Sequence, residues 1–214
     1  MKLYHFPLST YCQKTIMAFH EKEVTFTPEL VDLRNEAERN DYLKLYPLGK
    51  VPLLVREDGW MIPESTIIIE YLDTHFDTGT RLIPDDAELA RQVRFRDRMF
   101  DLYLNESVAS LLFQSWKPED ERDQELIEKS HFRVGVMYKF IEDDMTNKEW
   151  AVGDFFSMAD CAAAPALFCA QQVAPFVDRK VINQYWQRLN ARSSWQKIME
   201  EAAPYLEKLQ AATA

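Results

Sequence analysis

Hydrophobic and polar positions follow different periods in the first 77 residues and in the rest of the chain. In this first part, alternating or continuous apolar runs predict strands over residues 2–6, 24–31, 52–56 and 60–63. Helical spacing of apolar residues predicts helices over 10–22, 35–45 and 65–76. The predicted order is β-α-β-α-β-β-α, which is an α/β domain.

The spacing becomes almost entirely helical after a linker that contains Gly79 and Pro84. Asp85 with Glu88 is interpreted as a capping box that opens a helix to about Trp116. Pro118 is interpreted as the first residue of a second helix, which runs to about residue 145. A cap formed by Ser157 and Asp160 precedes three more helices, over 161–173, 180–190 and 194–209. The expected organisation is an α/β domain over 1–77, a linker over 78–85 and an all-α domain over 86–214.

Composition and charge narrow the possible functions. With 47% hydrophobic and 28% charged residues among 214, the chain is typical of globular proteins. The formal net charge of −10, without a basic patch, argues against binding to nucleic acid. The longest mostly apolar run is Cys161–Ala170, too short to span a bilayer, so no membrane association is expected. Three cysteines and four scattered histidines lack metal-ligand spacing, so no metal site and a reducing, cytoplasmic location are expected.

The run Ser9-Thr10-Tyr11-Cys12 lies where the first predicted strand passes into the first helix. Free backbone N–H groups and the positive end of the helix dipole favour a thiolate over a thiol at such a point. A plain helix cap explains Ser9 or Thr10 equally well. Cys12, one turn into the helix, fits a buried structural thiol better than a nucleophile.

Two further segments favour a ligand site over plain caps. A cis bond between Val51 and Pro52, at the start of an apolar strand, would leave neighbouring backbone groups free for a ligand. Ser65, at the start of a helix, can offer its hydroxyl and N–H to a carboxylate, while Glu64 can pair with an ammonium group. A first-turn acid followed by a cap is the alternative explanation of Glu64 and Ser65.

Together these segments resemble the glutathione S-transferase superfamily over nearly the whole chain. The resemblance is carried by the S-x-x-C run from Ser9 to Cys12, the P-x-G-K-V-P run over 47–52, the Glu64-Ser65 pair, and Gly153-Asp154 with residues 157–160. It implies a thioredoxin-like N-terminal domain and an all-helical C-terminal domain. Ser9 is similar in position to the catalytic serine of the serine-type theta, delta and zeta classes, and a bacterial member is expected.

The resemblance also implies a role for each matching residue. Ser9 would donate a hydrogen bond to the sulfur of glutathione, the co-substrate. Val51, presented by a cis Pro52, would pair through its backbone with the cysteinyl unit. Glu64 and Ser65 would hold the γ-glutamyl end. Lys50 would approach the glycyl carboxylate.

Some positions depart from the family pattern. Ala37 stands where delta-class relatives carry a glycyl-binding His, and Tyr46 replaces the common Asn before Pro47. Both departures weaken the expected contacts to the glycyl end. The zeta-class S-S-C run is not reproduced, which argues against a maleylacetoacetate isomerase.

The function implied is a homodimeric glutathione transferase that attacks a small hydrophobic electrophile with an activated thiolate. Candidate lining residues for the electrophile come from the helical domain: Phe100, Tyr103, Leu104 and Phe113. One alternative is a glutathione-dependent peroxidase or disulfide reductase in which Cys12 takes part. A second alternative is a non-catalytic, transferase-like binding or regulatory protein.

Overall fold

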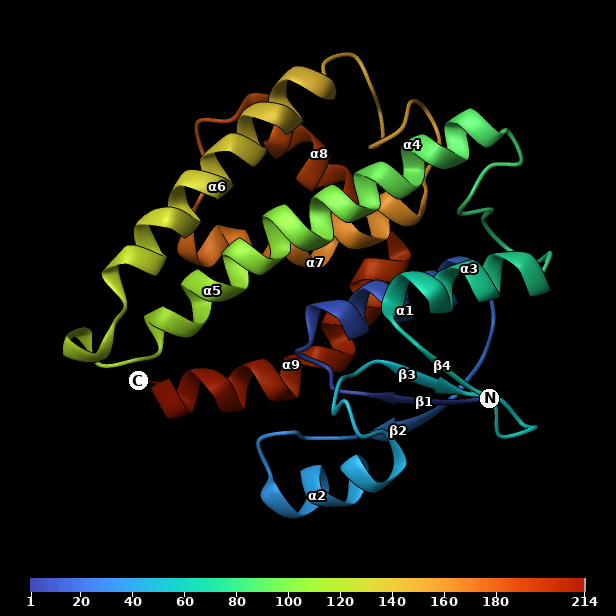
Figure 1. Ribbon diagram of the computed structural model, residues 1–214. Coiled ribbons are helices and arrows are strands. Elements are labelled where there is room, and N and C mark those ends of the chain that lie inside the picture. Colours follow the sequence, from blue (N-terminus) through green and yellow to red (C-terminus); the bar gives the residue numbers. More distant parts are fainter. Residues whose placement is uncertain (214) are drawn as a thin grey trace.

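The structure, a computed structural model, describes residues 1–213 and places a small α/β part against a helical part (Figure 1). The predicted fold class and element order are confirmed. The elements of the first part are β1 (Lys2–His5), α1 (Thr10–Glu21), β2 (Thr27–Leu30), α2 (Glu36–Leu45), β3 (Leu53–Val55), β4 (Met61–Pro63) and α3 (Ser65–His75).

The four strands form one mixed sheet in the order β2-β1-β3-β4. β2 is parallel to β1, while β3 is antiparallel to both β1 and β4; Leu3 pairs with Pro28 on one side and Leu54 on the other. Helices α1 and α3 cover one face of the sheet, and α2 lies against the other (Figure 1). This arrangement brings the N-termini of α1 and α3 to the same end of the sheet as the loop before β3.

β2 is shorter than the strand predicted over 24–31. Glu23 adopts a positive φ of 55°, and the N–H of Val24 donates to the carbonyl of Phe19 at 3.0 Å. The backbone at Val24 therefore closes the end of α1 and cannot pair in the sheet there.

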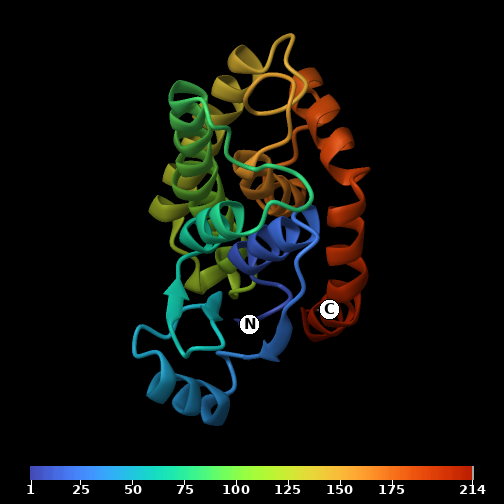
Figure 2. The same ribbon diagram turned by 90° about the vertical axis from the view of Figure 1, so that its right-hand side faces the viewer.

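The helical part follows the linker and packs around α7. Its helices are α4 (Ala87–Arg98), α5 (Glu106–Ser115), α6 (Gln124–Asp144), α7 (Met158–Val173), α8 (Lys180–Asn190) and α9 (Ser193–Thr213). Figure 2 shows α9 descending alongside α1, so its C-terminal end lies beside the α/β part. Within residues 1–213, no helix is long and apolar enough to cross a membrane.

Two predicted helix starts are wrong. Asp86, not Asp85, caps α4 by accepting from the N–H of Leu89 at 2.8 Å, because Asp85 is paired with Arg81. Pro118 precedes only a 3-10 turn, Glu119–Glu121, and α6 begins six residues later at Gln124. Its cap is Asp123, whose side chain accepts from the N–H of Leu126 at 3.0 Å.

A π-helical segment, Met99–Asn105, joins α4 to α5. The chain is therefore helical without a break from α4 to the end of α5, as predicted to about Trp116. Its middle part is a π-helix, which is wider than an α-helix. Such turns are frequent at functional sites.

The predicted cap at the start of α7 is confirmed. The N–H and the hydroxyl of Ser157 both donate to Asp160 Oδ2 at 2.8 Å. The other oxygen of Asp160 accepts from the N–H of Ala151 at 2.9 Å and from the hydroxyl of Tyr185 at 2.6 Å. The carboxylate thus joins the loop before α7 to α8 inside the core.

Glu21 connects the end of α1 to the helical part. Its carboxylate accepts two hydrogen bonds from the guanidinium of Arg192, at 2.6 and 2.7 Å, and others from Ser194 and Thr80. Burial raises the pKa of Glu21, but these hydrogen bonds outweigh it and hold the pKa below 4.5.

We expect Glu21→Gln to lower the free energy of unfolding by about 1–3 kcal/mol at neutral pH, since it removes one partner of a mostly buried ion pair. Because the folded-state pKa of Glu21 is depressed, its contribution is present above pH 4.5 and is lost as pH falls through that lower value. Urea unfolding of both proteins from pH 7 to pH 3 measures this, with the exposed Glu88→Gln as control. If the difference in unfolding free energy between Glu21→Gln and the unmodified protein stays the same at pH 3, the stabilising role of the Glu21 carboxylate is contradicted.

Candidate functional site

A cavity of about 190 Å³ lies between the two parts, where α1 and α3 begin. One wall comes from the α/β part and contains five of the six residues predicted from the sequence: Lys50, Val51, Pro52, Glu64 and Ser65. The facing wall comes from the start of α1 and from the helical part, and contains Tyr11, Arg98, Asp101, Leu102 and Glu106. Tyr46 completes the lining.

Ser9, the sixth predicted residue, caps α1 beside this cavity. Its Oγ accepts a hydrogen bond from the N–H of Cys12 at 3.4 Å, and its backbone is extended. The cap uses Ser9 only as an acceptor, so its O–H hydrogen is left to donate. Ser9 does not line the cavity itself; Tyr11, two residues further on, does.

The loop before β3 presents its backbone to the cavity. The Val51–Pro52 peptide bond is cis, as interpreted from the sequence. The hydroxyl of Tyr42, on α2, donates to the carbonyl of Lys50 at 2.7 Å and fixes the loop just before that bond. Val51 and Pro52 therefore lie next to each other in the cavity wall on an anchored backbone.

Glu64 and Ser65 belong to the same wall of the cavity. Glu64 has a φ of 70° and its side chain makes no capping hydrogen bond to α3. A positive φ is uncommon for a residue other than glycine, and such residues gather at functional sites. Ser65 is buried at the first position of α3, where the N–H groups of the first turn have no partner within the helix.

A buried charged cluster stands behind the facing wall. The ammonium of Lys14, a side chain only 1% exposed, lies 2.6 Å from Asp97 Oδ1 and 2.7 Å from Asp101 Oδ2. It also donates to the hydroxyl of Thr66 at 2.9 Å. Arg98 contacts both carboxylates and Thr66 from the cavity side. Two cations thus neutralise two carboxylates, and of the two only Lys14 comes from the other side of the boundary between the domains.

Sequence analysis missed this cluster and the facing wall. Burial raises the pKa of Asp101, whereas Lys14 and Arg98 oppose that effect. The only signal in the sequence is the run Asp97-Arg98 followed by Asp101, which is also compatible with an ordinary solvated helix face.

The thiol of Cys12 is fully buried, and burial raises its pKa to about 11. Its Sγ accepts from the N–H of Phe6 at 3.5 Å. A thiol in this state is protonated at neutral pH and poorly nucleophilic. These features favour the interpretation of Cys12 as a buried structural thiol over that of a nucleophile.

Two of the residues predicted to line an electrophile site do not do so. Phe100 and Leu104 are buried in the main hydrophobic core, because they fall on the inward side of the π-helical segment. Tyr103 and Phe113 are exposed, but neither lines the cavity of about 190 Å³.

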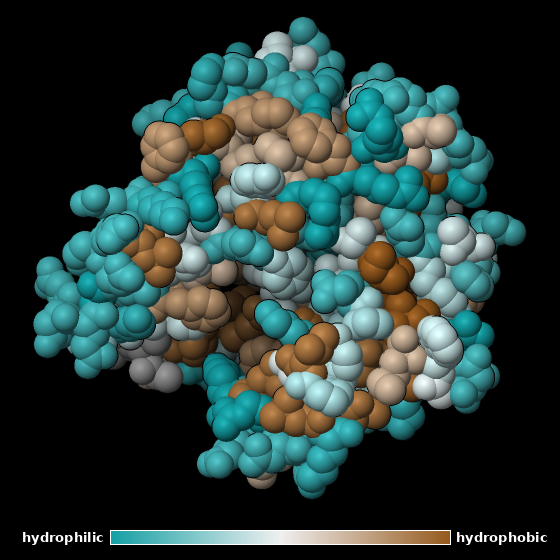
Figure 3. All heavy atoms as spheres, in the orientation of Figure 1, coloured by the Kyte–Doolittle hydropathy of each residue, from teal (hydrophilic) through white to brown (hydrophobic). Residues whose placement is uncertain are grey.

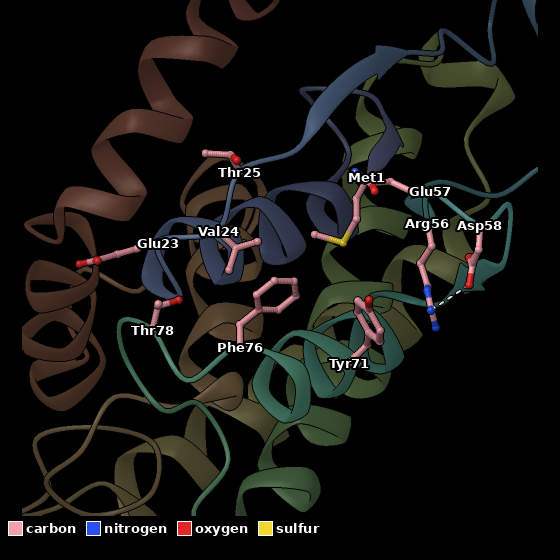
Figure 4. A pocket seen from close by; sticks show the side chains of 10 residues that line it. All are labelled: Met1, Glu23, Val24, Thr25, Arg56, Glu57, Asp58, Tyr71, Phe76 and Thr78. Atoms are coloured by element: carbon pink, nitrogen blue, oxygen red, sulfur yellow. Dashed lines mark ion pairs between the residues drawn. The ribbon is translucent and has the colours of Figure 1, made fainter.

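A larger and shallower groove of about 660 Å³ lies at another part of the α/β domain (Figure 4). Met1, Val24, Tyr71 and Phe76 form its apolar centre. Its charged rim is partly paired within the chain: Arg56 lies 2.8 Å from Asp58, and the N-terminal ammonium 3.8 Å from Glu57. The groove contains none of the predicted site residues.

The cavity, the cis proline and the two-part fold agree with what comparison of the sequence reveals. Residues 3–80 match the family described as "Glutathione S-transferase, N-terminal domain", and residues 104–193 match "Glutathione S-transferase, C-terminal domain". The chain belongs to the glutathione S-transferase superfamily, a family of enzymes that use glutathione as co-substrate.

Individual relatives match over almost the full length. Glutathione S-transferase hmp2 of Hypomyces subiculosus is 27% identical over 94% of this chain and 99% of its own. Glutathione S-transferase F10 of Arabidopsis thaliana is 28% identical over 90% of this chain and 93% of its own.

Solved structures of glutathione transferases have the same fold as this chain. Glutathione transferase F2 of Populus trichocarpa has a TM-score of 0.84 at 25% identity, covering 95% of this chain and 99% of its own. A glutathione S-transferase of Methylobacillus flagellatus, solved with glutathione bound, has a TM-score of 0.80 at 25% identity, covering 92% and 98%.

We expect Lys14→Met to lower the free energy of unfolding by about 3–5 kcal/mol, because it leaves two buried carboxylates facing a single cation. Lys139→Met is the matched control: its ion pair with Asp143 is exposed, so the loss should stay below about 1 kcal/mol. Urea unfolding at neutral pH measures both. Equal losses for the two variants would show that the buried cluster does not hold the domains together.

Proposed function

We propose that this protein conjugates glutathione to small electrophiles, with Ser9 as the residue that activates the thiol. The observation that carries the proposal is the gathering of Lys50, Val51, Pro52, Glu64 and Ser65 around one cavity, next to a helix capped by Ser9. These are the residues that the family resemblance assigns to glutathione. A serine-type member of the family is the class that this arrangement favours.

Glutathione is held, in this proposal, by local rather than global electrostatics. The α/β part carries eight Lys and Arg against thirteen Asp and Glu, and the whole chain has a net charge of −10, so the protein as a whole repels an anionic tripeptide. The N-terminal end of α3 attracts the γ-glutamyl carboxylate, while Glu64 pairs with the ammonium group of the same unit. The backbone of Val51 pairs with the cysteinyl unit, and Lys50 approaches the glycyl carboxylate.

Thiol activation needs only a modest free energy. A free thiol has a pKa near 8.5, and lowering it by two units takes about 2.7 kcal/mol. A charge-assisted hydrogen bond from the Ser9 hydroxyl contributes about 1.5–3 kcal/mol, and the dipole of α1 adds about 0.3–1 kcal/mol. The two contributions together amount to about 1.8–4 kcal/mol, a range that includes the free energy needed to make the thiolate abundant at neutral pH.

The electrophile reaches the sulfur from the side of the helical part. In Figure 3 the surface is hollowed between α5, the C-terminal part of α9 and the start of α1, with a hydrophobic floor. Phe6, next to the loop of Ser9, packs edge-on against Tyr205 of α9 at 5.8 Å between ring centroids. A small hydrophobic electrophile fits such surroundings.

The two alternative functions receive less support. A peroxidase or disulfide reductase that uses Cys12 needs an accessible thiolate, and the buried, protonated state of Cys12 argues against it. A non-catalytic protein does not require Ser9, the cis Val51–Pro52 bond and Glu64 to lie together at one cavity, and a measurement of glutathione binding decides between the two functions. The three cysteines of the described chain are free and buried, which fits a reducing, cytoplasmic compartment.

The working form in this proposal is a homodimer. Large apolar side chains are exposed on three neighbouring elements: Trp60 (67% exposed) before β4, Ile67 (51%) on α3 and Phe95 (47%) on α4. The carboxylate of Glu70 lies 2.7 Å from Arg94, which fixes α3 beside α4. A second copy that covers these side chains forms a closed, two-fold interface.

Ser9→Ala is expected to keep glutathione binding but to lose most of the bound thiolate and at least about tenfold in turnover, since one charge-assisted hydrogen bond is worth more than 1.4 kcal/mol. Calorimetry measures binding, and ultraviolet difference absorbance measures the thiolate. The variant also loses about 1 kcal/mol of stability as a cap. Ser9→Thr, which keeps the hydroxyl, controls for that loss.

Cys12→Ser provides the second comparison for the same assays. It should leave the thiolate and the conjugation rate unchanged, and loss of a peroxide-reducing activity in this variant would favour the redox alternative. Unchanged thiolate and turnover in Ser9→Ala would overturn the role of Ser9. Absence of glutathione binding in the unmodified protein would favour the non-catalytic alternative.

Light scattering is expected to give twice the chain mass of 25.2 kDa for the unmodified protein. The double variant Trp60→Glu, Ile67→Glu should shift it to the monomer, because two buried charges at the contact oppose association. Phe132→Glu, an exposed position on α6, is the control and should remain dimeric. A monomeric unmodified protein contradicts this interface.

A further inference from the structure

Glu106 is a charged residue of the cavity wall that the proposed function does not use. It is exposed at the start of α5, and its carboxylate makes no hydrogen bond or ion pair with any described residue. The other charged residues of this wall belong to the buried cluster, in which Lys14 and Arg98 balance Asp97 and Asp101. Glu106 therefore leaves one unbalanced negative charge on the wall that faces the proposed glutathione site.

The backbone places Glu106 beside the start of α1. The carbonyl of Asp101 accepts a hydrogen bond from the N–H of Glu106, and it also accepts from the hydroxyl of Tyr11 at 3.5 Å. Tyr11 follows Ser9 by two residues, so one carbonyl joins the segment that carries Glu106 to the helix that Ser9 caps. Leu102, four residues before Glu106 and 42% exposed, lines the same cavity and adds an apolar surface next to the carboxylate.

Bound glutathione increases the negative charge around Glu106. In the proposed function, Lys50 approaches the glycyl carboxylate, Glu64 pairs with the ammonium group, and the sulfur is a thiolate. Among the described residues that line the cavity, no unpaired cation then remains to balance the thiolate and Glu106. A cationic group on the electrophile is attracted by both negative charges, whereas an anionic group is repelled by both.

We infer that Glu106 determines the specificity for the second substrate, and that it selects electrophiles that combine a small apolar body with a cationic group such as an amidinium. The inference rests on the proposed function, because it needs the thiolate of bound glutathione. Leu102 contacts the apolar body, while the carboxylate of Glu106 pairs with the cationic group. Anionic electrophiles of the same shape are the poorest substrates.

The bonds that form and break are the same whatever charge the electrophile carries. With a benzylic chloride, the thiolate sulfur forms a bond to the benzylic carbon, and the carbon–chlorine bond breaks with its electron pair leaving as chloride. The proton of the thiol passes to water when the thiol is activated. Glu106 forms no bond and transfers no proton, so it acts on the choice of substrate through its charge alone.

Three benzylic chlorides of one shape test the inference: 4-(chloromethyl)benzamidine is cationic, 4-(chloromethyl)benzamide is neutral and 4-(chloromethyl)benzoate is anionic. Glu106→Gln keeps the shape of the side chain and removes its charge. We expect this variant to lower the ratio of kcat/KM for the benzamidine to kcat/KM for the benzoate by about tenfold, because attraction and repulsion, each up to about fivefold at an exposed site, both disappear. For the benzamide, kcat/KM should change by less than about twofold, since this substrate forms no ion pair.

Two further variants separate the local charge from net charge and from packing. Glu128→Gln, at an exposed position of α6 outside the cavity, removes the same net charge and should leave the ratio unchanged. Glu106→Lys should reverse the preference, so that the benzoate becomes a better substrate than the benzamidine. A purely structural role of Glu106 would instead change the rates of all three substrates alike.

The outcomes distinguish the inference from the proposed function. If the ratio is unchanged in Glu106→Gln, or if the three substrates change equally, the role of Glu106 is overturned, while glutathione binding and turnover of the benzamide leave the proposed function intact. If the unmodified protein binds no glutathione and converts none of the three substrates, the proposed function fails and the inference fails with it.

Discussion

The ammonium of Lys14, held between Asp97 and Asp101, is the interaction on which the geometry of the cleft depends. A charge that is 1% exposed is tolerated only with partners on every side. Those partners come from α4 and the π-helical segment, while Lys14 itself comes from α1. Satisfying one buried charge therefore fixes the distance between the helix that carries Ser9 and the helices that form the facing wall.

The same constraint explains how an acidic protein can present a site for an anionic tripeptide. Asp101, one of the acidic groups that line the cavity, is neutralised by Lys14 and Arg98. The cavity also presents the side chain of Lys50 and the backbone N–H groups at the start of α3. Short-range donors thus outweigh the unfavourable net charge.

The α/β part was largely predictable, because its signals are local. A proline opening a strand, a Glu-Ser pair opening a helix and a capping Ser9 can each be recognised within a few residues. The facing wall was not predictable for the opposite reason. Arg98 and Asp101 read as an ordinary polar helix face, and only the approach of α1 makes them part of a site. Phe100 and Leu104 were misplaced because the wider turn over 99–105 changes which side chains point inward.

That wider turn has a consequence for how such a protein can change. Residues before it dock on α3 through Arg94 and Glu70, whereas residues after it, such as Glu106, face the cavity. Deleting one residue within the turn would rotate α5 by about 100° relative to α4. A new set of side chains would then meet the substrate. Because Asp101 lies within the segment and holds Lys14, a change of substrate range made there is linked to the stability of the domain interface, unless the altered residue follows Asp101.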